Sequence, residues 1–163
     1  MPLNLSDPIS TLPKVNKSYL PKLKRLGIKT VEDLLYHFPS RHIDFSLVSK
    51  INQAQVGEIL TLRGQVAKIT SEPKGRGKSI QRATIIDETG QINAIWFNQP
   101  YLAKTLLGKT VSLSGEVKQF AGRLVLSSPD FEINSSYRKN IHTGRLVPVY
   151  SLTAGLSSRW LRW

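Results

Sequence analysis

The residues with the clearest potential for chemistry form the stretch "GRGKS" at positions 75–79. A Gly-Lys-Ser of this kind ends the loop that holds nucleotide phosphates in many ATPases and GTPases. The full pattern of that loop needs a glycine where this chain has Glu72, and it needs a helix after Ser79 whose N-terminal amides bind the phosphates. The residues that follow Ser79, "IQRATIID", are rich in β-branched side chains and indicate a strand instead. The sequence therefore argues against a nucleotide site here.

The same stretch is suited to the phosphates of a nucleic acid. The whole chain carries 23 Lys and Arg against 11 Asp and Glu, a formal net charge of +12, and such an excess is typical of proteins that bind a polyanion. We expect four nearby cations, with no acidic residue between them, to contact phosphates and release counterions: Lys74, Arg76, Lys78 and Arg82. The competing interpretations are a solvated loop without a partner and attraction to an anionic membrane surface.

Three aromatic residues, Trp96, Phe97 and Tyr101, supply the second element of nucleic-acid binding, because bases stack on aromatic rings. In the strand expected here, Trp96 and Phe97 point to opposite faces, so one ring should face the core and the other should not. Phe97 and Tyr101 are four residues apart, a spacing at which side chains on a helix lie side by side. The alternative is that all three rings belong to the core. The full set of candidate nucleic-acid-binding residues is Phe97, Tyr101, Lys74, Arg76, Lys78, Arg82, Arg63 and Trp96.

The rest of the sequence offers no catalytic or metal-binding constellation. It contains no cysteine, and its three histidines are not spaced like a zinc pair. Asp87 and Glu88 stand together in "DETG", which is a turn composition rather than an acid–base pair. We therefore predict no catalytic residue, no metal and no cofactor in this chain. No signal peptide and no apolar window of about 18 residues is visible, so we expect no membrane segment.

Residues 1–52 predict a small helical hairpin. Ser18 is expected to cap a first helix, which Gly27 ends as a left-handed residue. Thr30 is expected to cap a second helix together with Asp33, in the style of a capping box.

Residues 53–134 predict a small β-barrel, so the chain is expected to be mainly β with a helical extension. Apolar residues alternate in "LTLRGQV", "QRATIID" and "QINAIWF", where Gly64 should mark a bend or bulge in the first strand. A short helix follows in "NQPYLAKTLLG", capped by Asn98, and two further strands follow in "KTVSLSGEV" and "GRLVLSS". Three strands, a helix and two strands is the order of an OB-fold, a five-stranded Greek-key barrel. Other small barrels and sandwiches share the alternation, and the position of the helix favours the OB-fold.

Residues 135–163 predict a basic linker. The segment ends in an extended piece and the start of a helix that Ser157 is expected to cap. A helix of a single turn is not stable alone, so we expect either that the chain is a fragment or that this helix packs on something absent here. The segment contains five cations and no acidic residue: Arg138, Lys139, Arg145, Arg159 and Arg162.

Four stretches resemble, in order, the N-terminal wedge region of RecG, a family of ATP-dependent helicases that remodel branched DNA. "LKRLGIKTVEDLLYHFPSRHIDFS" resembles the helical lead-in of the family, where a "GI-T-DLL-hFP-RY-D" pattern is usual. "GEILTLRGQV" and "ATIIDETGQINAIWFNQPYLAKTLLGKTVSLSGEVK" resemble the start and the core of its OB-fold wedge. "GRLVPVYSLTAGLSSRWLR" resembles the join to the motor. Each motif is loose, but four in this order are specific.

The resemblance implies a mechanism and a set of partners. The wedge of this family binds a stalled replication fork or a Holliday junction, and the motor pulls duplex across it, so that strands separate during fork reversal, DNA repair and recombination. Two wedge aromatics stack on the bases at the branch point, and Phe97 and Tyr101 match that pair in position and spacing. The basic loop from Lys74 to Arg82 then lies in or near the path of the DNA arms. The implied partners are branched DNA and single-strand binding protein, with no membrane. The implied state is a monomer in a bacterial cytoplasm, associated with the nucleoid, or in an organelle.

The motor of the family is not part of this chain. We therefore expect that the chain alone neither hydrolyses ATP nor unwinds DNA, and that ATP and Mg²⁺ belong to the motor. The hairpin of the helical lead-in lacks the glycines that let a helix-hairpin-helix approach a phosphate, so residues 13–30 are expected to pack on other parts of the protein. Two other classes of protein fit the sequence: an RNA- or tRNA-binding OB-fold module, and an OB-fold adaptor that docks proteins.

Overall fold

The computed structural model describes residues 2–134 and 142–162. The chain divides into two compact units, residues 1–43 with 148–163 and residues 44–147. We call them the helical unit and the barrel unit. The predicted boundaries after residues 52 and 134 differ from these, because the barrel unit also includes residues 44–52 and 135–147, in which Phe45 and Val147 are buried. Arg138 and Lys139 of the predicted basic linker lie outside the described residues.

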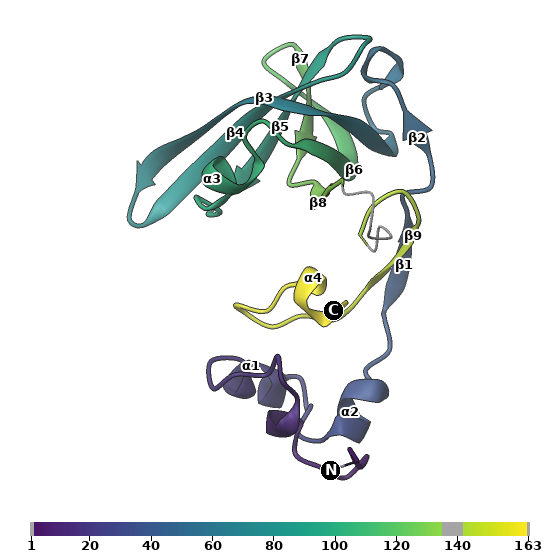
Figure 1. Cartoon of the computed structure of the whole chain (residues 1–163), viewed down its shortest axis with the longest axis vertical. Coiled ribbons are helices and arrows are strands. Elements are labelled where there is room, and N and C mark those ends of the chain that lie inside the picture. The colour runs from purple at the N-terminus through teal and green to yellow at the C-terminus, as the bar shows by residue number, and fades with distance from the viewer. Residues whose placement is uncertain (1, 135–141, 163) are drawn as a thin grey trace. The chain divides into compact units, whose positions relative to one another are not determined.

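The barrel unit follows the predicted order of three strands, a helix and two strands. Neighbouring strands pair in the ring β3–β4–β5–β7–β6–β3, in which only the β5–β7 pair is parallel. This closed Greek-key ring with a helix between its third and fourth strands is an OB-fold, as the sequence predicts. Figure 1 shows β3 and β4 as a long hairpin whose tip extends away from the remaining strands. The elements are β3 (Ile59–Gly75), β4 (Lys78–Ile86), β5 (Gln91–Phe97), α3 (Leu102–Leu106), β6 (Thr110–Phe120) and β7 (Arg123–Ser127).

Strand β3 closes the ring because it pairs with a different strand along each half. Its first half, from Ile59 to Gln65, pairs with β6, and its second half, from Gln65 to Gly75, pairs with β4. At Gly64, between the two halves, an added Cβ would lie 2.6 Å from the carbonyl oxygen of Ile86. Only glycine permits this approach of the two backbones. The predicted irregularity is present, but the shift in register falls after Val66 rather than at Gly64.

The core of the barrel unit explains the alternation in the sequence. Side chains that point inward from each strand are buried, and α3 closes one end of the barrel with two fully buried leucines. Each such side chain contributes roughly 1.5–3 kcal/mol through removal of apolar surface from water. The core includes Leu60, Leu62, Val66, Ala83, Ile85, Ile92, Ala94, Trp96, Leu102, Leu106, Leu113, Val117 and Leu126.

Four short strands add to these elements. β2 pairs parallel to β3, and β8 pairs antiparallel to β6. β1 and β9 form a separate two-stranded sheet. A short 3-10 helix at Ile51–Gln53 follows β2. The strands are β1 (Arg41–Asp44), β2 (Val48–Ser49), β8 (Asp130–Ile133) and β9 (Leu146–Val149).

The helical unit contains the predicted hairpin. Its capping box is confirmed: the hydroxyl of Thr30 accepts from the backbone N–H of Asp33, whose carboxylate accepts from the N–H of Thr30. Ser157 caps α4 as predicted, and accepts from the N–H of Trp160 at 3.2 Å. The expected cap at Ser18 is wrong, because that hydroxyl donates to Asn16 and the first helix begins one residue later than such a cap requires. The helices are a 3-10 helix at Ile9–Thr11, α1 (Leu20–Arg25), α2 (Val31–Leu35) and α4 (Ser158–Leu161).

A small apolar core holds the helical unit together. Ile9, Leu23 and Ile28 are almost fully buried there. The ring of Trp160 stacks on Tyr19, with ring centroids 4.5 Å apart, so α4 packs against the segment before α1. None of the described helices is long and apolar enough to cross a membrane.

Candidate nucleic-acid interface

Two of the three candidate aromatic residues are exposed, and the third is in the core. Phe97, the last residue of β5, is 51% exposed, and Tyr101, just before α3, is 56% exposed. Trp96 is 1% exposed, and its indole N–H donates to the carbonyl of Pro129 at 2.9 Å. Its ring also contacts Phe131 edge-on. The inclusion of Trp96 among the binding residues is therefore wrong, because no base can reach a ring with every face packed and its one polar atom paired.

The loop between β5 and α3 is held against β4 by Asn98. Asn98 adopts a left-handed backbone conformation with φ of +57°, which asparagine tolerates better than most residues. Its side-chain oxygen accepts from the backbone N–H of Ser79 at 3.0 Å, and its own N–H donates to the carbonyl of Ser79 at 2.8 Å. The expectation that Asn98 caps the following helix is therefore wrong, because its side chain is used across the sheet. Tyr101 occupies the cap position, with no side-chain capping bond.

A buried glutamine fixes the same loop from below. Gln81 is fully buried in β4, and its side-chain oxygen accepts from the backbone N–H of Gln99 at 2.8 Å. Its amide N–H groups donate to the hydroxyls of Ser71 and Ser79. Gln99 in turn accepts from the hydroxyl of Tyr101 at 2.9 Å. Hydrogen bonds thus hold the loop that carries Phe97 and Tyr101 in place before any ligand arrives, which lowers the entropy that binding must overcome.

The "GRGKS" stretch forms the tip of the β3–β4 hairpin. Gly75, Arg76 and Gly77 all have positive φ, at 77°, 49° and 71°, so the two glycines make the tight reversal possible. Lys74, Arg76 and Lys78 are exposed around this tip. Lys74 lies 3.3 Å from the carboxylate of Glu72, so its charge is partly balanced within the hairpin. The tip therefore presents Arg76 and Lys78 as its uncompensated cations among the described residues.

Strand register joins the aromatic and the basic residues on one surface. Phe97 lies opposite Ile80, and Ile95 lies opposite Arg82, in the β4–β5 pair. Directly opposed residues share a face, and residues two apart on a strand share it too. Phe97 and Arg82 are therefore on the same outer face, and the buried Trp96 is on the inner one.

Arg63 is exposed but is not brought to this surface. It lies in the half of β3 that pairs with β6, opposite Ser112. Lys74 is eleven residues farther along the same strand, a separation of about 35 Å at about 3.3 Å per residue. The structure therefore separates Arg63 from the hairpin tip and leaves its assignment to the site without support.

The β6–β7 turn adds residues that the sequence analysis missed. Phe120 is 60% exposed at the end of β6, directly opposite Arg123 at the start of β7. Ala121 and Gly122 between them have positive φ, as in a two-residue hairpin turn. The sequence signal was present in "KQFAGRLV", where an aromatic and a basic residue flank the turn, but only the fold shows which surface they join.

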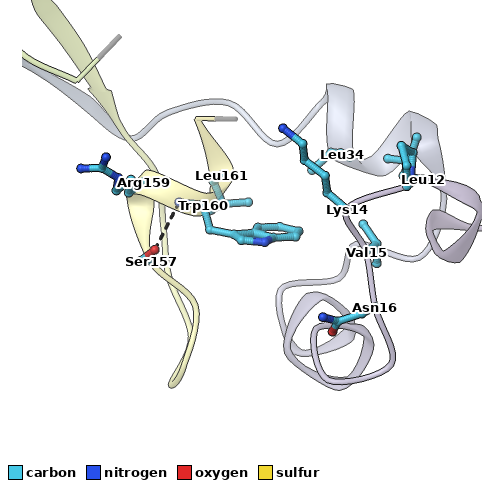
Figure 2. A pocket seen from close by; sticks show the side chains of 10 residues that line it. Leu12, Lys14, Val15, Asn16, Leu34, Ser157, Arg159, Trp160 and Leu161 are labelled. Atoms are coloured by element: carbon cyan, nitrogen blue, oxygen red, sulfur yellow. Dashed lines mark hydrogen bonds between the residues drawn. The ribbon is translucent and has the colours of Figure 1, made fainter. Parts of the chain in front are cut away.

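The helical unit contains a separate pocket of about 740 Å³. Figure 2 shows the indole of Trp160, on α4, pointing toward the segment that carries Lys14, Val15 and Asn16. Most of the lining is apolar, with contributions from Leu12, Leu34 and Leu161. Within residues 2–134 and 142–162, no three histidine or acidic side chains lie close enough together to hold a metal ion.

Comparisons with known proteins match nearly the whole chain. Residues 9–163 match the family model of the RecG wedge domain. The ATP-dependent DNA helicase RecG of Synechocystis sp. is 30% identical over 179 residues, which cover 98% of this chain and 21% of the relative. The RecG helicase of Thermotoga maritima is 31% identical over 166 residues, which cover 98% of this chain and 20% of the relative. A solved structure of RecG bound to a three-way DNA junction matches with a TM-score of 0.77 and 31% identity, and covers 99% of this chain and 22% of that chain. The chain thus spans about a fifth of the length of these relatives.

Proposed function

The chain belongs to the RecG wedge domain family, and we propose that it binds branched DNA at the point where the strands separate. The observation that carries this proposal is the pair Phe97 and Tyr101. Both rings are about half exposed on a loop that hydrogen bonds hold in place, beside a projecting basic hairpin. An exposed aromatic pair on an ordered loop has no role in the barrel core, and it is suited to stack on bases.

The two halves of the surface have different tasks in this proposal. Arg76, Lys78 and Arg82 contact the phosphates of a duplex arm, which contributes affinity for any DNA sequence. Phe97 and Tyr101 stack on the bases that become unpaired at the branch, which an unbroken duplex does not offer. The preference for a junction therefore comes from stacking and shape rather than from contacts to base edges. In a full-length helicase, a motor that draws duplex toward this surface would then separate the strands against the two rings.

Other properties implied by the family stay predictions. These are the interaction with single-strand binding protein, the monomeric state, the bacterial cytoplasmic or organellar location, and the use of ATP and Mg²⁺ by a motor outside this chain. The proposal for this chain concerns DNA binding alone.

Fluorescence anisotropy with two DNA ligands tests the proposal. The ligands are a three-way junction and a linear duplex of equal length and base composition, each at about 50 and about 200 mM salt. We expect the chain to bind the junction more tightly. Replacement of both rings, Phe97→Leu with Tyr101→Leu, should weaken junction binding by about tenfold or more, since each stacked base contributes about 1–3 kcal/mol. Binding to the linear duplex should stay unchanged.

Tyr36→Leu is the matched control, because Tyr36 is an aromatic residue of the helical unit that is at least as exposed as the pair. Equal affinity of the unaltered chain for junction and duplex would contradict the proposal. Tighter binding of a tRNA than of either DNA would instead favour an RNA-binding module. Absence of any nucleic-acid binding at about 50 mM salt would favour a protein adaptor. Thermal unfolding of each variant checks that the leucines have not disturbed the barrel.

A further inference from the structure

The pocket of the helical unit has the size and composition of a binding site. Its volume of about 740 Å³ falls within the range of roughly 300–1,000 Å³ that is typical of ligand sites in proteins. All the residues that line it belong to the helical unit, so the pocket is complete within that unit. Most of the lining is apolar, and its apolar members are Leu12, Pro13, Val15, Leu34, Trp160 and Leu161.

Trp160 is held in position at this pocket before any ligand arrives. Its backbone N–H donates to the hydroxyl of Ser157, and its ring stacks on Tyr19 with centroids 4.5 Å apart. Figure 2 shows the indole projecting from α4 toward Val15. The core of the helical unit nevertheless leaves Trp160, Leu34 and Leu161 only partly buried. An occupant that covers these side chains removes apolar surface from water and needs little reordering of the site.

Cationic side chains accompany the apolar lining. Lys14 and Arg159 line the pocket, and no acidic residue does. The ammonium of Lys22 is close by, 4.9 Å from the centroid of the Tyr19 ring that stacks on Trp160. The pocket therefore combines an apolar surface with a positive electrostatic potential.

The surrounding sequence strengthens this potential. Residues 8–31 and 148–162 contain eight lysines and arginines and no acidic residue. The acidic residues of the helical unit are Asp7, Glu32 and Asp33. The carboxylate of Asp33 is used in the cap of α2, where it accepts from the N–H groups of Lys29 and Thr30. An apolar pocket in positively charged surroundings is complementary to an apolar group that acidic residues flank.

The lining favours a peptide over a nucleic acid as the occupant. The edges of a base carry donors and acceptors, which lose their partners when they are buried against side chains such as Leu12, Leu34 and Leu161. A leucine, phenylalanine or tryptophan side chain has few polar atoms or none to leave unpaired. The charges around the pocket then select a peptide whose neighbouring residues are acidic.

We infer that this pocket docks an acidic segment of a partner protein. The segment inserts one large apolar side chain beside Trp160 and places its carboxylates near Lys14 and Arg159. This site goes beyond the proposed function, because Phe97 and Tyr101 belong to the barrel unit and the pocket belongs to the helical unit. The chain thus has one surface for DNA and a second, on a different unit, for a protein.

Selection from a library of random peptides of about twelve residues, on the immobilised whole chain at about 150 mM salt, tests the inference. We expect the selected peptides to combine several aspartates or glutamates with a tryptophan, phenylalanine or leucine. The variant Lys14→Glu with Leu34→Ala should bind them about tenfold or more weakly than the unaltered chain. Thermal unfolding checks that this variant is folded.

The matched control is Lys68→Gln with Lys109→Gln, which lowers the net charge by the same amount at two exposed lysines of the barrel unit. This control should bind the selected peptides as tightly as the unaltered chain. An equal loss of affinity in the control and in the pocket variant would show that net charge alone attracts the peptides, and it would overturn the inference.

The indole N–H resonances of the isotope-labelled chain locate the bound peptide. Trp160→Phe identifies the resonance of Trp160 and keeps an aromatic ring beside Tyr19. We expect a selected peptide to shift this resonance until the site is saturated. The resonance of Trp96, which is buried in the barrel core, should not move.

Four results would overturn the inference. The first is a library from which no acidic peptide is enriched, and the second is a bound peptide that leaves the Trp160 resonance unmoved. A shift of this resonance with single-stranded DNA but with no peptide would assign the pocket to nucleic acid. A shift on dilution of the chain alone would assign it to a second copy of the chain.

Discussion

At the scale of single residues, the position of the aromatic pair depends on the left-handed backbone of Asn98. The residue combines two properties: it adopts a φ of +57°, and its side chain accepts from the N–H of Ser79. A residue with a Cβ and no polar side chain lacks the second property and resists the first. Substitutions of Asn98 should therefore destabilise the loop that carries Phe97 and Tyr101 by different amounts, depending on which of the two properties they remove.

A pair of substitutions separates the two contributions. Asn98→Gly loses the side-chain hydrogen bond but keeps the backbone conformation, whereas Asn98→Ala loses the bond and also adds strain. We expect the alanine variant to be less stable than the glycine variant by about 1 kcal/mol, measured by urea unfolding. The alanine variant should also show a smaller preference for a junction over linear duplex than the glycine variant does. Equal stability of the two variants would mean that the left-handed conformation is not required.

Trp96 and Phe97 show how much of the site could be predicted from residue types and strand alternation. The alternation of a strand required that the two adjacent rings face opposite sides, and it predicted that only one of them is buried. The residue types did not indicate whether Trp96 or Phe97 is the buried ring, since both side chains are large and apolar. In the structure, the buried Trp96 indole donates to the carbonyl of Pro129, which lies 33 residues away in the sequence. A partner so distant in the sequence could not be predicted from the residue types.

At the scale of elements, the turn between β4 and β5 is organised by the carboxylate of Asp87. One oxygen accepts from the N–H and the hydroxyl of Thr89 and from the N–H of Gly90, and the other accepts from the N–H of Ile51. Partial burial would raise the pKa of this carboxyl group. The hydrogen bonds from Thr89, Ile51 and Gly90 outweigh that effect and hold the pKa below its ordinary value of 3.8.

The depressed pKa predicts a pH dependence of stability. A group with a lowered pKa in the folded state stabilises the fold above its unfolded pKa and loses that contribution as the pH falls through the folded value. The difference in unfolding free energy between the unaltered chain and Asp87→Asn should thus be constant from about pH 7 to about pH 5. It should shrink below about pH 4, the region of the ordinary value of 3.8. Urea unfolding of both proteins across this range measures it. A difference that persists undiminished at about pH 3 would show that ionisation of Asp87 is not its source.

The elements themselves were largely predictable, and their ends were not. Strand alternation and the helix position identified the OB-fold, because a barrel core imposes a period of two on every strand. The expected caps at Ser18 and Asn98 failed because each side chain found another partner, Asn16 in one case and Ser79 in the other. Strand β2 has only two residues, too few for a periodic signal.

A groove at the β6–β7 turn could not be predicted from the sequence for a related reason. Arg82, Asn93 and Arg123 come from three different strands, and the parallel pairing of β5 with β7 brings them together. Strands that pair in parallel in a Greek key are not adjacent in the chain, so no local sequence pattern indicates that they pair. The hairpin tip could be predicted from the sequence, since all its residues are consecutive.

At the scale of the whole molecule, the excess of positive charge attracts nucleic acid. The positions of the unpaired cations determine which residues contribute to the contacts with phosphates. A net charge of +12 attracts any nucleic acid. Lys74 and Lys118 are each paired with a glutamate, whereas Arg76 and Lys78 at the hairpin tip have no such partner among the described residues. The phosphate component of binding should therefore depend on Arg76 and Lys78 more than on Lys74 of the same hairpin.

This distribution predicts which neutralisations change the dependence of binding on salt. For a duplex ligand, Arg76→Gln with Lys78→Gln should lower the slope of log affinity against log salt by about 1.8, because each lost phosphate contact removes about 0.9. Affinity for a junction and for linear duplex should fall by the same factor, since phosphates do not distinguish them and the aromatic pair is intact. Lys74→Gln is the matched control at the same hairpin; its effect on the slope should be smaller, because Glu72 already balances part of its charge. An equal change in slope for Lys74→Gln, or a selective loss of junction binding in the double variant, would mean that the hairpin acts through more than its unpaired cations.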